Sequence, residues 1–193
     1  DNDPPGLDTV AQIISFQRMP SCDTSGSRIY GTSHYQLAKQ CGVSVNSILL
    51  IGGGGHCRSS IDVIEAEGKY IIAGIVCQPR GDREPVLGYK VLGDDEDLPE
   101  LFKKYKFALI TVGQIKSVNV RVKVFQQVQR LGFELPTIIS PRAYVSKNAS
   151  LGIGTIVMHD ALVNIGAKIG NNCILNTKSL VEHDVIVEDH CHL

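Results

Sequence analysis

The sequence predicts an α/β domain with a Rossmann-like parallel sheet, followed by a left-handed parallel β-helix. Two observations support this fold class. Between residues 47 and 139, short aliphatic runs alternate with helix-compatible segments, which is the order of a parallel α/β sheet. From residue 143 onward, aliphatic residues recur at every sixth position, a period that fits neither a helix nor a simple strand. The predicted division is therefore 1–46, unassigned; 47–139, α/β; and 140–193, β-helix.

The α/β prediction begins with a buried strand at Ile48–Ile51, four glycines at Gly52–Gly55, and a helix to about Glu67. Gly68 suits the left-handed residue that often ends a helix. The glycine loop only partly matches the dinucleotide fingerprint, because Cys57 takes the place of its third glycine. A nicotinamide dehydrogenase is therefore disfavoured. The loop either lets an anionic group reach the helix N-terminus or is a tight turn that binds nothing.

The following segments continue the alternation of strands and helices. We expect a strand at Tyr70–Cys77, a polar loop at Gln78–Lys90, a short helix at 94–105, and a strand at Lys106–Val112. Residues 118–131 begin with alternating valines, but their length, their glutamines and arginines, and the glycine that follows favour a helix.

The C-terminal repeat consists of eight complete hexads and the first three residues of a ninth, with an aliphatic third position and a mostly small first position. Such hexapeptide repeats are typical of a β-helix, in which the aliphatic side chains stack inside the coil. The residues expected to point inward are Val145, Leu151, Val157, Val163, Ile169, Leu175, Val181 and Val187. Because the chain stops within a hexad and solenoids normally end in a cap, we expect the array to be truncated at its C-terminus.

Composition excludes several classes of function. The 193-residue chain has a net charge of −1 and lacks a basic run, so no nucleic-acid footprint is present. Residues 35–48 superficially match a helix-turn-helix, but the glycines would break the recognition helix. The apolar runs are too short to span a bilayer, so no membrane partner is expected. Six scattered cysteines without a CxxC pair indicate free thiols and a cytoplasmic location.

Three histidines, His183, His190 and His192, lie among carboxylates near the end of the chain and avoid the inward position of the repeat. Histidine titrates near neutral pH and can act as a general base, with a neighbouring carboxylate to orient its ring. A zinc site built from the three histidines is an alternative, although their spacing matches no established ligand pattern. A non-catalytic sugar-binding or scaffold solenoid is a further alternative.

The stretches ILLIGGGGHCRSSIDVIEAEG, ITVGQIKSVNVRVKVFQQVQRLGFELPTIISPRAYVS and NTKSLVEHDVIVEDHCHL resemble one family. It comprises the bacterial hexapeptide acyltransferases with a small Rossmann-like N-terminal domain, including sialic acid O-acetyltransferases and UDP-4-amino-sugar N-acetyltransferases of glycan biosynthesis. The resemblance covers about residues 47–193. It implies acetyl-CoA as co-substrate, a sugar or sugar nucleotide as acceptor, and a homotrimer with its active sites between subunits.

The resemblance also implies roles for individual residues. His183 matches the general base, Asp184 the carboxylate that orients it, and His192 the histidine near the acetyl thioester. His190 has no counterpart and is expected on the surface. No metal ligand is implied. The sugar-binding loop of the family matches Gly54, Gly55 and His56.

Two positions depart from the pattern of the family. The second strand often ends in Asp-Asp, which helps to hold the nucleotide, whereas this chain has Cys77-Gln78. Ser140 stands where a His-Pro pair is frequent. The first departure weakens the case for a UDP-linked acceptor and is compatible with a free sugar acid such as a sialic acid.

Overall fold

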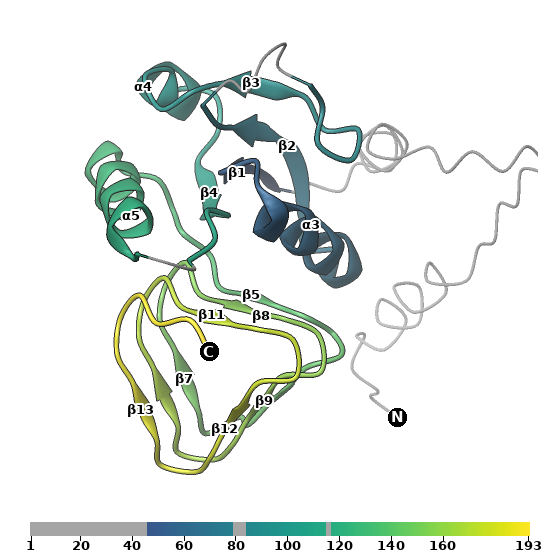
Figure 1. The fold of residues 1–193 in the computed structure, drawn as a ribbon, viewed down its shortest axis with the longest axis vertical. Coiled ribbons are helices and arrows are strands. Elements are labelled where there is room, and N and C mark those ends of the chain that lie inside the picture. The colour runs from purple at the N-terminus through teal and green to yellow at the C-terminus, as the bar shows by residue number, and fades with distance from the viewer. Residues whose placement is uncertain (1–45, 79–83, 115–116) are drawn as a thin grey trace, which may run out of the picture.

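The computed structural model describes residues 46–78, 84–114 and 117–193, so segment 1–45, including most of the helix-turn-helix-like stretch, lies outside the described residues. The first part of the described chain is built on a parallel sheet with strand order β3-β2-β1-β4 (Figure 1). Its strands are β1 (Asn46–Ile51), β2 (Tyr70–Val76), β3 (Val91–Gly93) and β4 (Phe107–Ile110).

Helices cover both faces of this sheet (Figure 1). They are α3 (Gly55–Glu67), α4 (Leu98–Phe102) and α5 (Asn119–Leu131). Successive side chains of a strand point to opposite faces. Ile48 and Leu50 of β1 accordingly pack with α3, whereas Leu49 and Ile51 pack with α4 and α5. Both faces of β1 are buried, which explains why its sequence is a continuous aliphatic run.

The structure confirms most of the expected elements and corrects two. Residues 119–131 form a helix, as predicted, and Gly68 ends α3 in the left-handed conformation. The helix expected at 94–105 is shorter, because the acidic residues before Leu98 form a turn and α4 begins only at Leu98, with Pro99 in its first turn. In that turn the backbone N–H of Asp94 donates to the Asp97 carboxylate at 3.0 Å. Strand β3 was not expected, since its three residues are defined only by pairing with β2.

The second part is a left-handed β-helix with three sheets, in the orders β11-β8-β5, β12-β9-β6 and β13-β10-β7. Paired residues such as Ser150 and Lys168 are 18 positions apart, so one coil contains three hexads. Figure 1 shows the coil almost end-on as a triangle. The strands are β5 (Ile138–Ile139), β6 (Tyr144–Val145), β7 (Ser150–Leu151), β8 (Ile156–Val157), β9 (Leu162–Val163), β10 (Lys168–Ile169), β11 (Ile174–Leu175), β12 (Leu180–Val181) and β13 (Ile186–Val187).

The predicted inward positions form the core of the coil. Val145 and Leu151 are partly buried, and the other six predicted residues are buried. The corners between strands depend on the sixth position of each hexad, which adopts a positive φ in seven consecutive hexads from Gly154 to His190, with values between 53° at Asn172 and 73° at Gly166. Asparagine, aspartate and glycine tolerate this conformation best, which explains their frequency at these positions.

One face of the β-helix packs against the α/β part. Outward residues of sheet β11-β8-β5, such as Ile156 and Ile174, join the hydrophobic core around Ile61 and Ile64 of α3. The corner between β12 and β13 is the vertex of the triangle opposite this face, and it points away from the α/β part (Figure 1). In the part of the chain that the structure describes, no helix has the length and hydropathy needed to cross a membrane.

Candidate functional site

The glycine loop connects β1 to α3, and it is tightly packed at its first residue but open at its last two. Gly52 has a φ of 119°, and a Cβ there would lie 2.6 Å from the Val112 backbone nitrogen, so only glycine fits. A Cβ at Gly54 or Gly55, by contrast, would meet no heavy atom within 4 Å. The loop is therefore closed where it leaves the sheet and open at the N-terminus of α3, where helix N–H groups are available to an anion.

His56 lies in the first turn of α3. Its Nε2 atom is buried and has no hydrogen-bond partner among the described residues. Burial, with smaller contributions from Arg121 and His192, lowers the pKa of His56 to about 4. His56 is therefore a neutral imidazole at pH 7, and its buried ring nitrogen is a polar group whose hydrogen bond a ligand or water would supply.

His192 lies at the end of the β-helix, near His56. It pairs with Ile174 one coil earlier, and its ring centroid is 6.5 Å from that of His56. Its Nδ1 atom is 2.8 Å from the carbonyl oxygen of Gln114. Because a carbonyl oxygen only accepts hydrogen bonds, Nδ1 carries the proton, and Nε2 of the neutral ring is an acceptor, 3.4 Å from the Asn176 amide nitrogen. The fold thus brings the expected His56 and His192 together.

His183 lies elsewhere, at the exposed corner between β12 and β13, and its side chain is 67% exposed. Its Nδ1 atom is 2.9 Å from Oδ2 of Asp184, and this hydrogen bond raises the pKa of His183. The corner is opposite the face that carries His192. Within one subunit, His183, the expected base, therefore lies far from His192, the histidine expected near the thioester.

His190 is not a free surface histidine, contrary to expectation. Its ring packs edge-on against Phe125 of α5, with centroids 5.1 Å apart, and its Nδ1 lies 3.0 Å from the Asn172 amide nitrogen. Burial lowers the pKa of His190. His183, His190 and His192 do not converge, and within the described ranges no group of three or more His, Cys, Asp or Glu side chains is placed to hold a metal ion.

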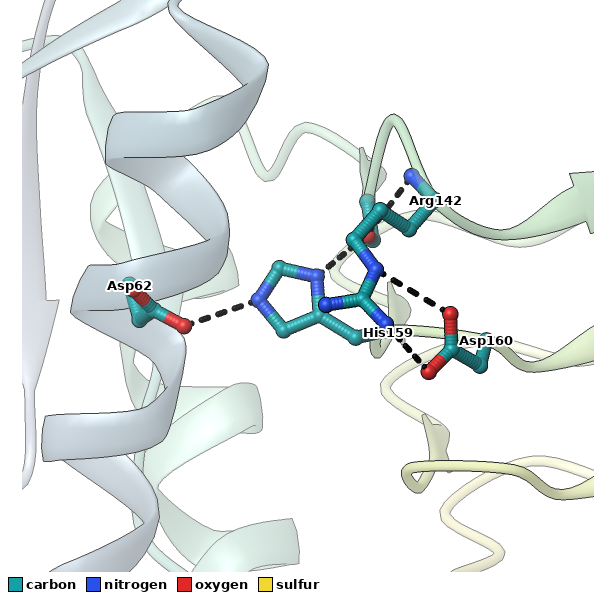
Figure 2. A network of polar contacts seen from close by, with 5 residues as sticks. Asp62, Arg142, His159 and Asp160 are labelled. Atoms are coloured by element: carbon teal, nitrogen blue, oxygen red, sulfur yellow. Dashed lines mark hydrogen bonds and ion pairs between the residues drawn. The ribbon is translucent and has the colours of Figure 1, made fainter.

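A second histidine network joins the two parts of the chain and was not expected from the sequence. The Nε2 atom of His159 lies 2.9 Å from the Asp62 carboxylate on α3, and its Nδ1 lies 2.6 Å from Ser140 Oγ (Figure 2). The order Ser-His-Asp is that of a hydrolase triad. Ser140 is only 1% exposed, however, and its Oγ accepts the Arg142 backbone N–H at 3.0 Å. A buried serine cannot attack a substrate, so this network is an interdomain joint.

A local pattern in the sequence marks His159 itself, but not its partner on α3. His159 and His183 occupy the same place in their hexads, and each precedes an aspartate. Asp160 forms a two-pronged ion pair with Arg142, with distances of 3.1 and 2.7 Å (Figure 2). His159 is thus paired with Asp62 of α3, whereas His183 is paired with its own neighbour. Of these two His-Asp pairs, only His183–Asp184, at the corner between β12 and β13, is exposed and able to meet a substrate.

A Rossmann-like domain that presents a glycine loop to a hexapeptide β-helix with a histidine–aspartate corner defines the class of hexapeptide acyltransferases. Residues 47–128 match the family described as the PglD N-terminal domain. The chain also resembles PerB from Caulobacter crescentus, solved with CoA and GDP-perosamine, at 33% identity over 77% of this chain and 69% of that chain, with a TM-score of 0.69.

A further similar structure is the acetyltransferase domain of PglB from Neisseria gonorrhoeae in complex with acetyl coenzyme A, at 30% identity over 76% of this chain and 69% of that chain, with a TM-score of 0.68. WeeI from Acinetobacter baumannii shares the fold at 18% identity over 75% and 68% of the two chains, with a TM-score of 0.63. The chain belongs to the hexapeptide-repeat sugar acetyltransferase family, and it is therefore an acyltransferase.

Proposed function

We propose that the protein transfers the acetyl group of acetyl-CoA to a hydroxyl or amino group of a sialic-acid-like sugar in bacterial glycan biosynthesis. The observation that carries the proposal is the exposed His183–Asp184 pair, 2.9 Å apart, on a hexapeptide β-helix. The acceptor oxygen or nitrogen forms a bond to the thioester carbonyl carbon as His183 takes its proton. The carbon–sulfur bond then breaks, and CoA leaves as a thiol after receiving the proton.

The geometry of the pair suits a general base. The Asp184 carboxylate only accepts hydrogen bonds, so it holds the proton of His183 on Nδ1 and leaves Nε2 as the base. The carboxylate also stabilises the imidazolium that forms as the proton is transferred. A positioned base of this kind contributes on the order of 10²- to 10⁴-fold to the rate.

The acetyl-CoA half of the site is assigned to the seam between the glycine loop and the β-helix. His192 would contact the pantetheine arm near the thioester, with Gly54, Gly55 and His56 towards the sugar. Because Nδ1 of His192 donates to Gln114, the neutral ring has no second proton with which to stabilise an oxyanion. The developing negative charge is then assigned to backbone N–H groups.

The separation of His183 from His192 supports a homotrimer in which each active site combines residues of two subunits. A second observation favours the same assembly. The sheet next to the His183 corner carries an outward apolar row formed by Tyr144, Leu162 and Leu180, which are 60%, 36% and 56% exposed. These residues are paired in register, so they form a continuous strip on a flat face. Packing this face against a neighbouring subunit would bury the strip and bring the His183 corner to the interface.

The acceptor proposal rests on the end of β2. Doubly wound sheets bind their ligands at the carboxyl ends of the strands, where a carboxylate often holds a ribose hydroxyl. Here Cys77 follows β2 in place of such a carboxylate. It packs closely on the glycine loop, since a Cβ at Gly53 would lie 2.8 Å from its sulfur. The carboxylate of a sialic-acid-like sugar suits the open N-terminus of α3. A nucleotide-linked amino sugar is the second candidate, because the relative PerB was solved with GDP-perosamine.

The experiment incubates the purified protein with acetyl-CoA and either a free sialic acid or a nucleotide-linked amino sugar. Release of CoA thiol is followed with a thiol reagent, and the product is identified by its mass and by its sensitivity to alkali, which cleaves esters but not amides. We expect acceptor-dependent thiol release with the sialic acid. Preference for the nucleotide-linked sugar would move the assignment to the second candidate. Thiol release that never depends on a sugar would contradict both.

A further inference from the structure

Arg121 is a fully buried arginine on the first turn of α5 that connects the two parts of the chain. Its Nη1 donates to the carbonyl oxygens of Ile110 and Val112, at 2.7 and 2.9 Å, where the chain leaves β4. Its Nε donates to the carbonyl oxygen of Asn172 at 3.1 Å, in the β-helix corner between β10 and β11. One guanidinium therefore ties the end of β4 to a coil of the β-helix.

This arrangement is energetically demanding. Among the described residues Arg121 has no carboxylate partner, and its Nη2 has no hydrogen-bond partner. Burial lowers the pKa of Arg121 to about 10, so the side chain still carries its charge at neutral pH. A buried charge without a counterion is costly, and the three hydrogen bonds to carbonyl oxygens offset only part of that cost. An apolar residue of similar size would fill the same volume without this cost, so a role beyond packing is indicated.

Both attachments of Arg121 lead to the hydrogen bond that orients His192. Val112 is followed two residues later by Gln114, whose carbonyl oxygen accepts the His192 Nδ1 proton at 2.8 Å. On the other side, the Asn172 side chain contacts His190, two residues before His192. Arg121 thus holds the segment that carries Gln114, the acceptor, in place relative to the coil that carries His192, the donor.

The loop held by Arg121 also supports His56. A Cβ at Gly113, between Val112 and Gln114, would lie 3.3 Å from Cβ of His56, so this loop packs closely on the first turn of α3. Displacement of the loop would move the support of both histidines at the seam. Through this contact at Gly113, a displacement of the segment after β4 would also displace the first turn of α3.

We propose that Arg121 is a positioning residue for the acetyl-CoA half of the active site, acting through Gln114 on His192. It sets the orientation of the His192 ring and makes no contact with the reacting atoms. The inference rests on the proposed function, because it requires that His192 contacts acetyl-CoA.

The test is a double-mutant cycle between Arg121→Lys and His192→Ala. Lysine keeps the charge but lacks the planar fork that spans two directions, so it cannot hold both attachments. We expect Arg121→Lys to raise the KM for acetyl-CoA on the order of 10- to 100-fold in the wild-type background. In the His192→Ala background the same change should alter KM less than about 2-fold, because residues acting through one contact are not additive. Arg121→Gln is measured in parallel, so the result does not depend on one variant.

The matched control is Arg130→Lys, an exposed position in the last turn of the same helix, which should leave the KM for acetyl-CoA unchanged. Fully multiplicative effects of Arg121→Lys and His192→Ala would overturn the positioning role and leave the proposed function intact. So would a fall in Tm without any change in KM. If His192→Ala itself bound acetyl-CoA normally, the assignment of His192 would fail first, and the role of Arg121 with it.

Discussion

His183 and Asp184 form a hydrogen-bonded pair, Nδ1 to Oδ2 at 2.9 Å, at an exposed corner where Asp184 adopts a left-handed φ of 61°. The pair is local, since both residues belong to one turn of the β-helix. Its hydrogen bond raises the pKa of His183. A general base works in its neutral form, so kcat should rise with pH through that raised pKa.

Asp184→Asn should therefore move the acid limb of the pH profile of kcat to lower pH. Removing the carboxylate removes the interaction that favours imidazolium, so His183 stays neutral in more acidic solution. Asparagine tolerates the left-handed conformation, which separates this effect from a change in the corner. Asp160→Asn, at the same hexad position but paired with Arg142, is the control. An unchanged acid limb, or one moved to higher pH, would contradict the role of the pair.

In the proposed homotrimer, assembly depends on the apolar strip of Tyr144, Leu162 and Leu180. Leu180→Glu should convert the trimer to monomers, because it places a charge within the apolar strip that the proposed interface buries. The matched control is Ser150→Glu, an exposed residue of β7 on another sheet, which should leave the trimer intact. Light scattering coupled to size exclusion measures both. A wild-type protein that is only monomeric would count against the shared active site as well.

The stability of the coil depends on its inward positions. Val163 is fully buried and pairs with Val145 and Val181 in adjacent coils. Val163→Asp should lower the free energy of unfolding by more than about 4 kcal/mol, because the carboxylate would be buried without a partner. Ser150→Asp, on the outside of the coil, should cost less than about 0.5 kcal/mol. Urea denaturation followed by circular dichroism distinguishes them, and similar losses for both variants would rule out the inward assignment.

The low pKa of His56 predicts a specific dependence of stability on pH. The folded form has a pKa of about 4, below the ordinary value of 6.5. Between these values the unfolded chain binds more protons, so stability rises with pH across this window and is complete above it. Lowering the pH from about 7.5 to 5 should cost about 2 kcal/mol through His56. In His56→Gln this part of the loss should vanish in urea titrations at both pH values. An identical loss in the variant would show that His56 titrates normally.

The repeat could be predicted from the sequence because each side chain in it has a role fixed by its period. The six-residue spacing alone identifies Val163 as buried, and the structure agrees. Strand β1 and helices α3 and α5 were equally readable, since aliphatic runs and the glycines at 68 and 132 mark them. By contrast, β3 exists through pairing with β2, and a three-residue segment carries too little pattern to predict that pairing.

The site was only partly predictable for a related reason. Sequence spacing puts His183 nine residues before His192, but in the coil this distance corresponds to half a turn, which places them on opposite sides. The contacts of Arg121 with Asn172 and of His159 with Asp62 join residues 51 and 97 positions apart. Such contacts depend on how the β-helix docks on α3 and α5, and no local pattern encodes that docking.

The measurement that tests the central claim most directly compares His183→Ala with the wild-type enzyme for both kcat and acetyl-CoA binding. We expect kcat to fall on the order of 10²- to 10⁴-fold while the Kd for acetyl-CoA is unchanged, because the base contacts the proton of the acceptor. Asp160→Asn, at the hexad position equivalent to Asp184 but paired with Arg142, is the control and should retain most of the activity. Full activity of His183→Ala, or activity lost to a chelator and restored by zinc, would contradict His183 as the base of an acetyl transfer.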